Sequence, residues 1–334
     1  MVISWLQQQW RGTTVWQALL TPLSWLFAML SGGRRLLYRL GVLSSQKLPV
    51  PVIVVGNISV GGTGKTPLVI WLAEQLASHG WRPGIISRGY GGHATIIQAV
   101  NKNGDARVTG DEPLLLAQRL PYPVWIGASR AAAGQALLAA HPDTDILISD
   151  DGLQHLGLVR DYEIAVVDAR CGFGNGRLLP AGPLREAVSR LARLDAIVIN
   201  QTGTPHLDMP VLPGSYAMRL TGSFFYNLKQ PQQQAIANDF QQLTIHAVAG
   251  IGNPQRFFEQ LTALGMDIIP HAFADHHQFQ ANELNFAGII IMTEKDAVKC
   301  LHFATEQMWV WPVHAQLDPE LIPHLLAKLG NHHG

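Results

Sequence analysis

The chain has 334 residues, of which 47% are hydrophobic and 14% charged, so it is long enough for two globular domains with cores of their own. Its 24 basic and 24 acidic side chains give a net charge of zero, which lends no support to a nucleic-acid partner. The two cysteines, Cys171 and Cys300, lie far apart in the chain, which argues against a disulfide scaffold or a zinc site and indicates a reducing compartment.

Residues 1–40 form the first distinct segment. The segment is basic, because no Asp or Glu precedes Glu74. Residues 15–30 carry no charge and are followed by a group of arginines. A bilayer-spanning helix needs about 20 apolar residues, and this run is shorter and contains Pro22. We therefore predict a membrane-associated helix that lies in the membrane surface or barely spans it, with its arginines on the cytoplasmic side. The alternative is a helix packed on the protein's own core.

A phosphate-binding loop is predicted next. Residues 52–55 are a short, β-branched apolar run typical of a buried strand, and apolar residues recur at helical spacing from Lys65 onward. The residues between them match the pattern G-x-x-x-x-G-K-[ST], except that a serine stands first. They are Ser59, Val60, Gly61, Gly62, Thr63, Gly64, Lys65 and Thr66.

Each part of this loop suits ATP. The glycines let backbone N–H groups face phosphate oxygens, and the following helix adds the positive end of its dipole. Lys65 can reach the β- and γ-phosphates, and the Thr66 hydroxyl can ligate Mg²⁺. The alternative is a glycine-rich turn that only joins a strand to a helix.

Two polar segments follow. Residues 87–92 come directly after a strand end, so Arg88 lies where ligands bind in open α/β sheets and could hold a phosphate, although a surface arginine is the alternative. Further on, Asp111 and Glu112 precede Pro113 and an apolar helical stretch. The residue pattern alone favours a helix cap for these carboxylates. In a phosphotransferase, the same position could supply a base to a substrate hydroxyl.

An acidic pair follows the apolar strand predicted at 145–149. The pair is Asp150 and Asp151. A Walker B element has this form, and its aspartate helps to hold Mg²⁺. Both residues qualify as the metal ligand, and the alternative is an acidic surface turn.

The fold class follows from the order of strands and helices. Further strands at 163–168 and 195–200 alternate with helical stretches, which predicts a parallel sheet covered by helices on both faces. We therefore expect an α/β protein with a P-loop NTPase-type parallel-sheet domain at 41–205.

A second, smaller α/β domain is predicted at 206–334. The sequence turns polar after residue 201, and we place the linker near 201–215. The second domain has predicted strands at 245–248, 288–292 and 309–313. Its Gly-x-Gly at 250–252 is too short for a dinucleotide-binding fingerprint.

Taken together, the motifs closely resemble the tetraacyldisaccharide 4'-kinase family, the lipid A 4'-kinases of Gram-negative bacteria. The resemblance runs over nearly the whole chain, and its ordered set of motifs is specific where the phosphate loop alone is generic. The motifs are VGNISVGGTGKTP at 55–67, SRGYGG at 87–92, GDEP at 110–113, DDGLQH at 150–155, LPAGPLRE at 179–186, ADH at 274–276 and MTEKDAVKC at 292–300.

The resemblance implies a reaction and a place for it. ATP, with Mg²⁺, would phosphorylate the 4'-hydroxyl of a lipid disaccharide 1-phosphate to give the 1,4'-bisphosphate. The reaction would occur at the cytoplasmic face of the bacterial inner membrane, in a cleft between two α/β/α domains. The expected partners are the lipid substrate and the membrane surface, with no nucleic acid, and we expect a monomer.

The resemblance also implies residue roles. Asp111 becomes the base, which replaces the cap interpretation. His276 looks like the residue that orients or tunes Asp111, and it is preferred to His277 because it follows Ala-Asp. Lys65 acts on the phosphates, Asp150 is the first choice as metal ligand and Asp151 the second. The candidates for substrate contacts or for bracing the site are Arg88, Glu112, Arg185 and Glu186.

Three other classes of protein fit the sequence less well. A membrane-tethered regulatory ATPase of the MinD or ParA type has a similar loop, but that class carries a lysine where this chain has Val60, and its amphipathic helix tends to be C-terminal. A GTPase would need Asn-Lys-x-Asp, and residues 293–296 have the wrong order. A non-enzymatic lipid-binding protein would leave the phosphate loop and the acidic pair unexplained.

Overall fold

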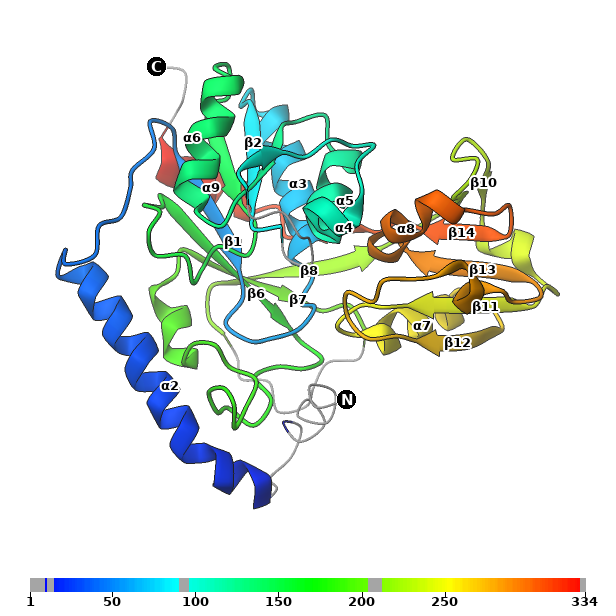
Figure 1. The fold of residues 1–334 in the computed structure, drawn as a ribbon, viewed down its shortest axis with the longest axis horizontal. Coiled ribbons are helices and arrows are strands. Elements are labelled where there is room, and N and C mark those ends of the chain that lie inside the picture. The colour runs from blue at the N-terminus through cyan, green and yellow to red at the C-terminus, as the bar shows by residue number, and fades with distance from the viewer. Residues whose placement is uncertain (1–9, 11–14, 90–95, 204–211, 331–334) are drawn as a thin grey trace.

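A nine-stranded sheet is the centre of the larger of two units in the computed structural model (Figure 1), which describes residues 10, 15–89, 96–203 and 212–330. Its strand order is β15-β8-β7-β6-β1-β5-β2-β4-β3, in which the seven central strands are parallel and the two edge strands antiparallel to their neighbours. The strands are β1 (Val52–Gly56), β2 (Pro83–Ser87), β3 (Gln98–Ala99), β4 (Val124–Ile126), β5 (Ile146–Ser149), β6 (Tyr162–Asp168), β7 (Ala196–Asn200), β8 (Ser215–Thr221) and β15 (His314–Leu317).

Helices cover both faces of this sheet, as the sequence predicts. Along β1, Ile53 and Val55 pack in one core cluster with the helices α3, α5 and α9, whereas Val52 and Val54 pack in another with α6. Every residue of β1 is buried, because successive side chains of a strand point to opposite faces and both faces are covered. The helices are α3 (Lys65–Ser78), α4 (Ala106–Thr109), α5 (Asp111–Arg119), α6 (Arg130–Ala140), α9 (Leu321–Leu329) and a 3₁₀ helix (Val188–Arg193).

A six-stranded sheet forms the second unit, in the order β10-β9-β14-β13-β11-β12. Its aromatic core packs under α7 on one face, and a second core that includes Cys300 lies under α8 on the other. The elements are β9 (Phe225–Asn227), β10 (Gln234–Ala235), β11 (Ile245–Ala249), α7 (Pro254–Ala263), β12 (Ile268–Ala272), β13 (Ile289–Thr293), α8 (Glu294–Cys300), β14 (Met308–Trp311) and 3₁₀ helices at Ala237–Phe240, Ala281–Leu284 and Leu301–Phe303. The predicted fold class of a parallel-sheet domain with a smaller α/β domain is confirmed.

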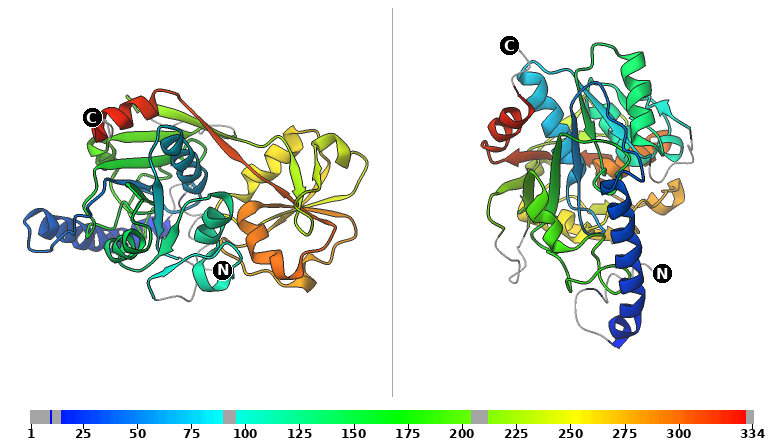
Figure 2. Two further views of the ribbon diagram at one scale, coloured as in Figure 1. Left: turned by 90° about the horizontal axis from the view of Figure 1, so that it is seen from above. Right: turned by 90° about the vertical axis from the view of Figure 1, so that its left-hand side faces the viewer.

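The second unit is inserted within the larger one. The chain leaves the nine-stranded sheet after β8 and returns through β15, which pairs antiparallel with β8, and α9 then packs on the same core (Figures 1 and 2). The predicted second domain comprised residues 206–334, so β8, β15 and α9 depart from that boundary. Much of the predicted 201–215 linker and the end of the 87–92 loop lie outside the described residues.

Helix α2 (Val15–Arg39) lies along the outside of the larger unit (Figure 1), while residues 1–9 and 11–14 are outside the described part of the chain. Two of its polar side chains face the protein: Ser24 Oγ donates to the Leu178 carbonyl at 2.9 Å, and Ser24 and Gln17 are buried. Its large apolar side chains are exposed instead, Trp25 at 70% for example. This arrangement is the reverse of a helix packed on its own core, and the helix is long and apolar enough to cross a membrane.

Candidate active site

The phosphate loop has the predicted strand–loop–helix form. It follows β1, and α3 begins at Lys65 with Gly64 as the N-cap residue. Gly61 and Gly64 have φ values of 115° and 96°, in the left-handed region that glycine adopts without strain. A Cβ on Gly64 would lie only 2.7 Å from Asn200 Nδ2, so the position has no room for a side chain. Gly61 is therefore needed for the turn, and Gly64 both for the turn and for the close approach of Asn200.

The first two residues of the predicted phosphate loop contact another segment of the chain. Ser59 forms an isolated antiparallel bridge with Leu184, and the Val60 N–H donates to the Pro183 carbonyl at 2.9 Å. These contacts hold the loop against residues 183–184, near Arg185 and Glu186. The curled part that can turn its amides inward begins at Gly61.

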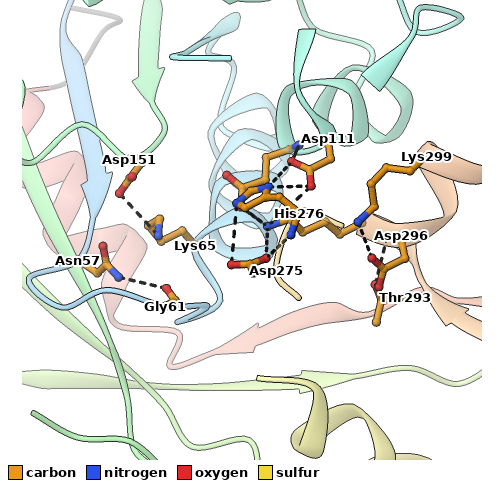
Figure 3. Close-up of polar contacts among 12 residues, drawn as sticks. Asn57, Gly61, Lys65, Asp111, Asp151, Asp275, His276, Thr293, Asp296 and Lys299 are labelled. Atoms are coloured by element: carbon orange, nitrogen blue, oxygen red, sulfur yellow. Dashed lines mark hydrogen bonds and ion pairs between the residues drawn. The ribbon is translucent and has the colours of Figure 1, made fainter. Parts of the chain in front are cut away.

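The acidic pair lies at the carboxyl end of β5, beside the phosphate loop. Asp151 has a φ of 47°, and its carboxylate lies 3.6 Å from Lys65 Nζ and 3.2 Å from Arg185 Nη1. Burial alone would raise the pKa of Asp151, but Lys65 and Arg185 bring it to about 2. Asp151 is therefore ionised and held opposite the loop lysine (Figure 3).

Asp150 has a different environment. It is 1% exposed, and neither of its carboxylate oxygens has a hydrogen-bond partner among the described residues. Burial, followed by the nearby negative charge of Glu112, raises the pKa of Asp150 to about 7. A buried carboxylate without partners is costly, and a bound cation would remove that cost.

These oxygens suit Mg²⁺. Among the described residues there is no group of three or more His, Cys, Asp or Glu side chains that could hold a metal ion. A protein Mg²⁺ site typically uses one or two carboxylates and completes its shell with substrate phosphates and water. Asp150, Asp151 and Thr66 on the first turn of α3 supply hard oxygen donors of that kind.

Asp111 and His276 are brought together from the two units (Figure 3). Asp111 is the first residue of α5 and is 2% exposed, and His276 follows β12 with a φ of 61°. The Nδ1 atom of His276 lies 3.0 and 2.9 Å from the two Asp111 carboxylate oxygens. The neighbouring His277 contacts Glu283 at 3.1 Å instead. The cap interpretation is partly met, because α5 begins at Asp111, but its N-cap residue is Gly110.

The pair sets the charge of both partners. Burial alone would raise the pKa of Asp111, but the hydrogen bond from His276 and the charge of Lys295 lower it. Burial alone would lower the pKa of His276, but the bond to Asp111 raises it. The contact therefore stabilises the ionised form of the carboxylate and the protonated form of the imidazole.

Lys295, to which the sequence analysis gave no role, is the centre of this cluster. It lies at the start of α8, and its Nζ is 2.9 Å from Glu112 Oε1, 3.2 Å from Asp275 Oδ1 and 4.0 Å from Asp111 Oδ2. Burial opposes the charge, but the three carboxylates raise the pKa of Lys295. The signal was present in the Thr-Glu-Lys-Asp run after a strand end, which the sequence analysis used only for the resemblance and against a GTPase.

A cavity of about 410 Å³ runs from α2 to the acidic pair. All four predicted substrate candidates line it: Arg88, Glu112, Arg185 and Glu186. Other residues line it to which no role was predicted, namely Phe27, Ser31, Arg34, Arg35 and Arg130, together with Gln154 and His155 of the DDGLQH motif. Long-range contacts bring the first five residues to the cavity, whereas Gln154 and His155 directly follow the acidic pair in the sequence.

Helix α2 contributes directly to this cavity. Arg35 Nη1 lies 2.7 Å from Glu186 Oε2, and Gln154 Nε2 donates to Glu186 Oε1 at 2.8 Å. On the same wall, burial and the charges of Arg130 and Arg88 lower the pKa of His155 to about 4, so that His155 is neutral. The cavity therefore joins the apolar outer helix to a cationic interior near the phosphate loop.

Comparison with known proteins shows the family of the chain. A model of the family described as Tetraacyldisaccharide-1-P 4'-kinase matches residues 16–330. The tetraacyldisaccharide 4'-kinase of Methylobacillus flagellatus is 50% identical over 327 residues, covering 97% of this chain and 96% of that protein. That of Azoarcus sp. is 51% identical, covering 96% and 94%. The crystal structure of the "apo" form of LpxK from Aquifex aeolicus in complex with ATP has a TM-score of 0.79 at 30% identity, covering 94% of this chain and 98% of that one.

These matches extend over nearly the whole chain, including α2 and the second unit. They confirm the predicted kinase and favour it over a regulatory ATPase of the MinD or ParA type. The chain belongs to the Tetraacyldisaccharide-1-P 4'-kinase family.

Proposed function

We propose that this chain transfers the γ-phosphoryl group of ATP to the 4'-hydroxyl of tetraacyldisaccharide 1-phosphate and so forms the 1,4'-bisphosphate. One observation carries the proposal. The cavity beside α2 is lined both by Asp151, which pairs with the phosphate-loop lysine, and by Glu112, the neighbour of Asp111. A hydroxyl in that cavity would therefore lie close to the segment that carries Asp111 and to a phosphate held by the loop.

Asp111 is the proposed base, and His276 positions it. The carboxylate accepts the proton of the 4'-hydroxyl as the new oxygen–phosphorus bond forms and the bond to the ADP oxygen breaks. Its lowered pKa makes Asp111 a modest base. Phosphoryl transfer passes through a loose transition state, in which positioning and charge neutralisation matter more than a strong base. The buried contact with His276 supplies the positioning.

Lys65 and the inward-facing amides from Gly61 to Thr66 are the proposed ATP cradle. Asp150, Asp151 and Thr66 would hold Mg²⁺, which when bound neutralises charge on the transferring phosphates. Asp150 supports this assignment, because its carboxylate oxygens are buried without protein partners among the described residues. The salt bridge to Arg185 holds the Asp151 carboxylate beside the phosphate loop.

The lipid is proposed to enter past α2 from the cytoplasmic face of the inner membrane. The exposed apolar side chains of α2 would lie among acyl chains, and its exposed arginines, Arg34 and Arg39, would lie at the headgroups. Arg88, Arg185, Glu112 and Glu186 would contact the disaccharide or brace the cavity. The enzyme is proposed to act as a monomer, because the two units of one chain supply every group named here.

A label-transfer assay tests the function. Purified enzyme is given γ-labelled ATP, Mg²⁺ and tetraacyldisaccharide 1-phosphate in detergent micelles, and label in the lipid is counted. Label is expected with the wild type and with Lys47→Ala, an exposed lysine outside the site, but not with Lys65→Ala. ATP hydrolysis by the wild type without label in the lipid would overturn the proposal.

A further inference from the structure

Three successive carbonyl groups of the phosphate loop accept hydrogen bonds from side chains outside its curled part. The bonds run from Asn57 Nδ2 to the Gly61 carbonyl at 3.4 Å, from Arg256 Nη2 to the Gly62 carbonyl at 2.9 Å and from Asn200 Nδ2 to the Thr63 carbonyl at 3.0 Å. Figure 3 shows the first of them. The three donors come from three elements: the end of β1, α7 of the second unit and the end of β7.

These bonds bear on the direction of the loop amides. A peptide unit is planar and trans, so its C=O and N–H groups point in opposite directions. A carbonyl drawn outward therefore turns the next residue's N–H inward, which is what a phosphate-binding loop requires. Each carbonyl also needs a partner when it is buried. The three side chains meet both needs at consecutive peptides.

Arg256 differs from the two asparagines. It belongs to the second unit and is 6% exposed, and its Nη1 lies 3.2 Å from Asp168 Oδ2 at the end of β6. Asp168 is itself 4% exposed and accepts the Arg170 N–H at 2.9 Å. The guanidinium is thus fixed by the larger unit on one side and holds the Gly62 carbonyl on the other.

The backbone of the second unit touches the loop at the same place. A Cβ on Gly252 would lie 2.5 Å from the Gly62 nitrogen, a backbone atom that cannot move aside alone. Gly252 lies just before α7, the helix that carries Arg256. The turn before α7 therefore seats on the phosphate loop, and only glycine fits.

We propose that Arg256 is a positioning residue for ATP: it holds the Gly62 carbonyl outward so that the following amide faces the phosphates. ATP affinity then depends on the seating of the second unit on the phosphate loop. The inference rests on the proposed function, because it takes the loop to be the ATP cradle. It adds a requirement for ATP binding that lies outside the phosphate-loop motif.

Substitution of Arg256 tests the inference. Arg256→Met removes the donors and keeps most of the side-chain length. Loss of one charged hydrogen bond to the loop is expected to raise the Kd and KM for ATP about tenfold or more. The KM for the lipid is expected to change by less than about twofold. Arg219→Met, at an exposed arginine on β8, is the matched control and is expected to bind ATP like the wild type.

Two further variants distinguish a specific loss of ATP binding from a loss of folding. Arg256→Met leaves Asp168 buried without its ion pair, so Arg256→Met with Asp168→Asn removes both charges together. Gly252→Ala keeps Arg256 and lifts the turn off the loop, and Gly157→Ala, where the nearest contact is an ordinary 3.5 Å, is its control. Both the double variant and Gly252→Ala are expected to weaken ATP binding while their thermal unfolding stays cooperative.

The outcomes separate the inference from the proposed function. If the wild type binds ATP and either Arg256 variant binds it equally well, the inference is wrong and the proposed function stands. A parallel rise in the KM for ATP and for the lipid would also contradict the inference, because it indicates a general structural loss. If the wild type binds no ATP, both are wrong.

Discussion

Asp111 and His276 stand 165 positions apart in the chain and meet with 2.9 Å between carboxylate oxygen and imidazole nitrogen. Asp111 opens α5 of the larger unit, and His276 follows β12 of the second. Neither unit alone holds the pair. The contact therefore makes the seating of the two units a condition for placing the proposed base.

Loss of His276 should shift the pH dependence of the reaction. Burial favours protonation of Asp111, and the bond from His276 opposes it. In His276→Ala that opposition is weaker, so the pKa of Asp111 rises and the acidic limb of kcat/KM moves to higher pH. Turnover at neutral pH should fall about tenfold or more, because the base is also less well held. Steady-state rates across the pH range measure both effects.

The control for this variant is His277→Ala, which removes the adjacent histidine with its contacts to Glu283, Phe273 and Phe279 but leaves the Asp111–His276 pair in place. We expect its pH profile to match that of the wild type. An acidic limb that stays in place in His276→Ala would show that His276 does not tune Asp111.

Asp111→Asn should separate the base from the nucleotide site. The substitution removes the proton acceptor and keeps the size of the side chain, so kcat should fall about 10²–10⁴-fold. The Kd for ATP, measured by titration, should stay near that of the wild type. Asp105→Asn, which alters an exposed helix cap, is the comparison. A large loss of ATP binding in Asp111→Asn would place Asp111 among the metal ligands instead.

Substitution of the two lysines of α8 should affect different properties, turnover in one case and stability in the other. Lys295 contacts the carboxylates around the proposed base, so Lys295→Met should lower kcat about tenfold or more. Lys299 and Asp296 form a fully buried pair at 2.7 Å, so Lys299→Met should cost about 3–5 kcal/mol of unfolding free energy. Denaturant titration and rate measurements on both variants test the contrast. Equal loss of stability in the two would argue that Lys295 is only structural.

Asp150→Asn should abolish kinase activity and increase the free energy of unfolding. The carboxylate is buried without hydrogen-bond partners among the described residues, and an amide avoids the cost of a buried charge. Without nucleotide or Mg²⁺ at neutral pH, the variant should be about 1–3 kcal/mol more stable than the wild type. Its kinase activity should be lost, and added Mg²⁺ should not restore it. A variant that keeps its Mg²⁺ dependence would remove Asp150 from the metal site.

The exposed apolar face of α2 should control membrane binding. Trp25 and Leu30 are 70% and 63% exposed, and neither lines the cavity. Trp25→Gln with Leu30→Gln should weaken binding to anionic vesicles about tenfold or more, with little change in ATP affinity. Leu243→Gln with Leu264→Gln changes two exposed leucines of the second unit and serves as the control. Unchanged vesicle sedimentation would contradict the membrane role.

Local motifs predicted the parts of the fold and site that depend on short stretches of chain. The strand, loop and helix around Lys65 follow one another directly, and the acidic pair follows its own strand, so each was visible in a single window of sequence. Their common position at one sheet edge then follows from the parallel order of β1 and β5.

The remaining features depend on contacts between distant residues. The residue pattern around Asp111 fits a helix cap equally well, and only the family resemblance paired it with His276. Lys295 looks like an ordinary first-turn residue of α8 until α5 is placed beside it. The pairing of β15 with β8 joins residues about a hundred positions apart, so no local pattern returns the chain to the larger unit. The orientation of α2, with Ser24 toward the protein and large apolar side chains outward, likewise depends on contacts with residues 177–181.

One comparison tests the central claim, that the 4'-hydroxyl receives the phosphoryl group, most directly. Wild-type enzyme with γ-labelled ATP is given tetraacyldisaccharide 1-phosphate or the same lipid with its 4'-oxygen methylated, and label in each lipid is measured. The account predicts label in the first lipid and none in the second. Equal label in both lipids would show transfer to another site, and would contradict the account.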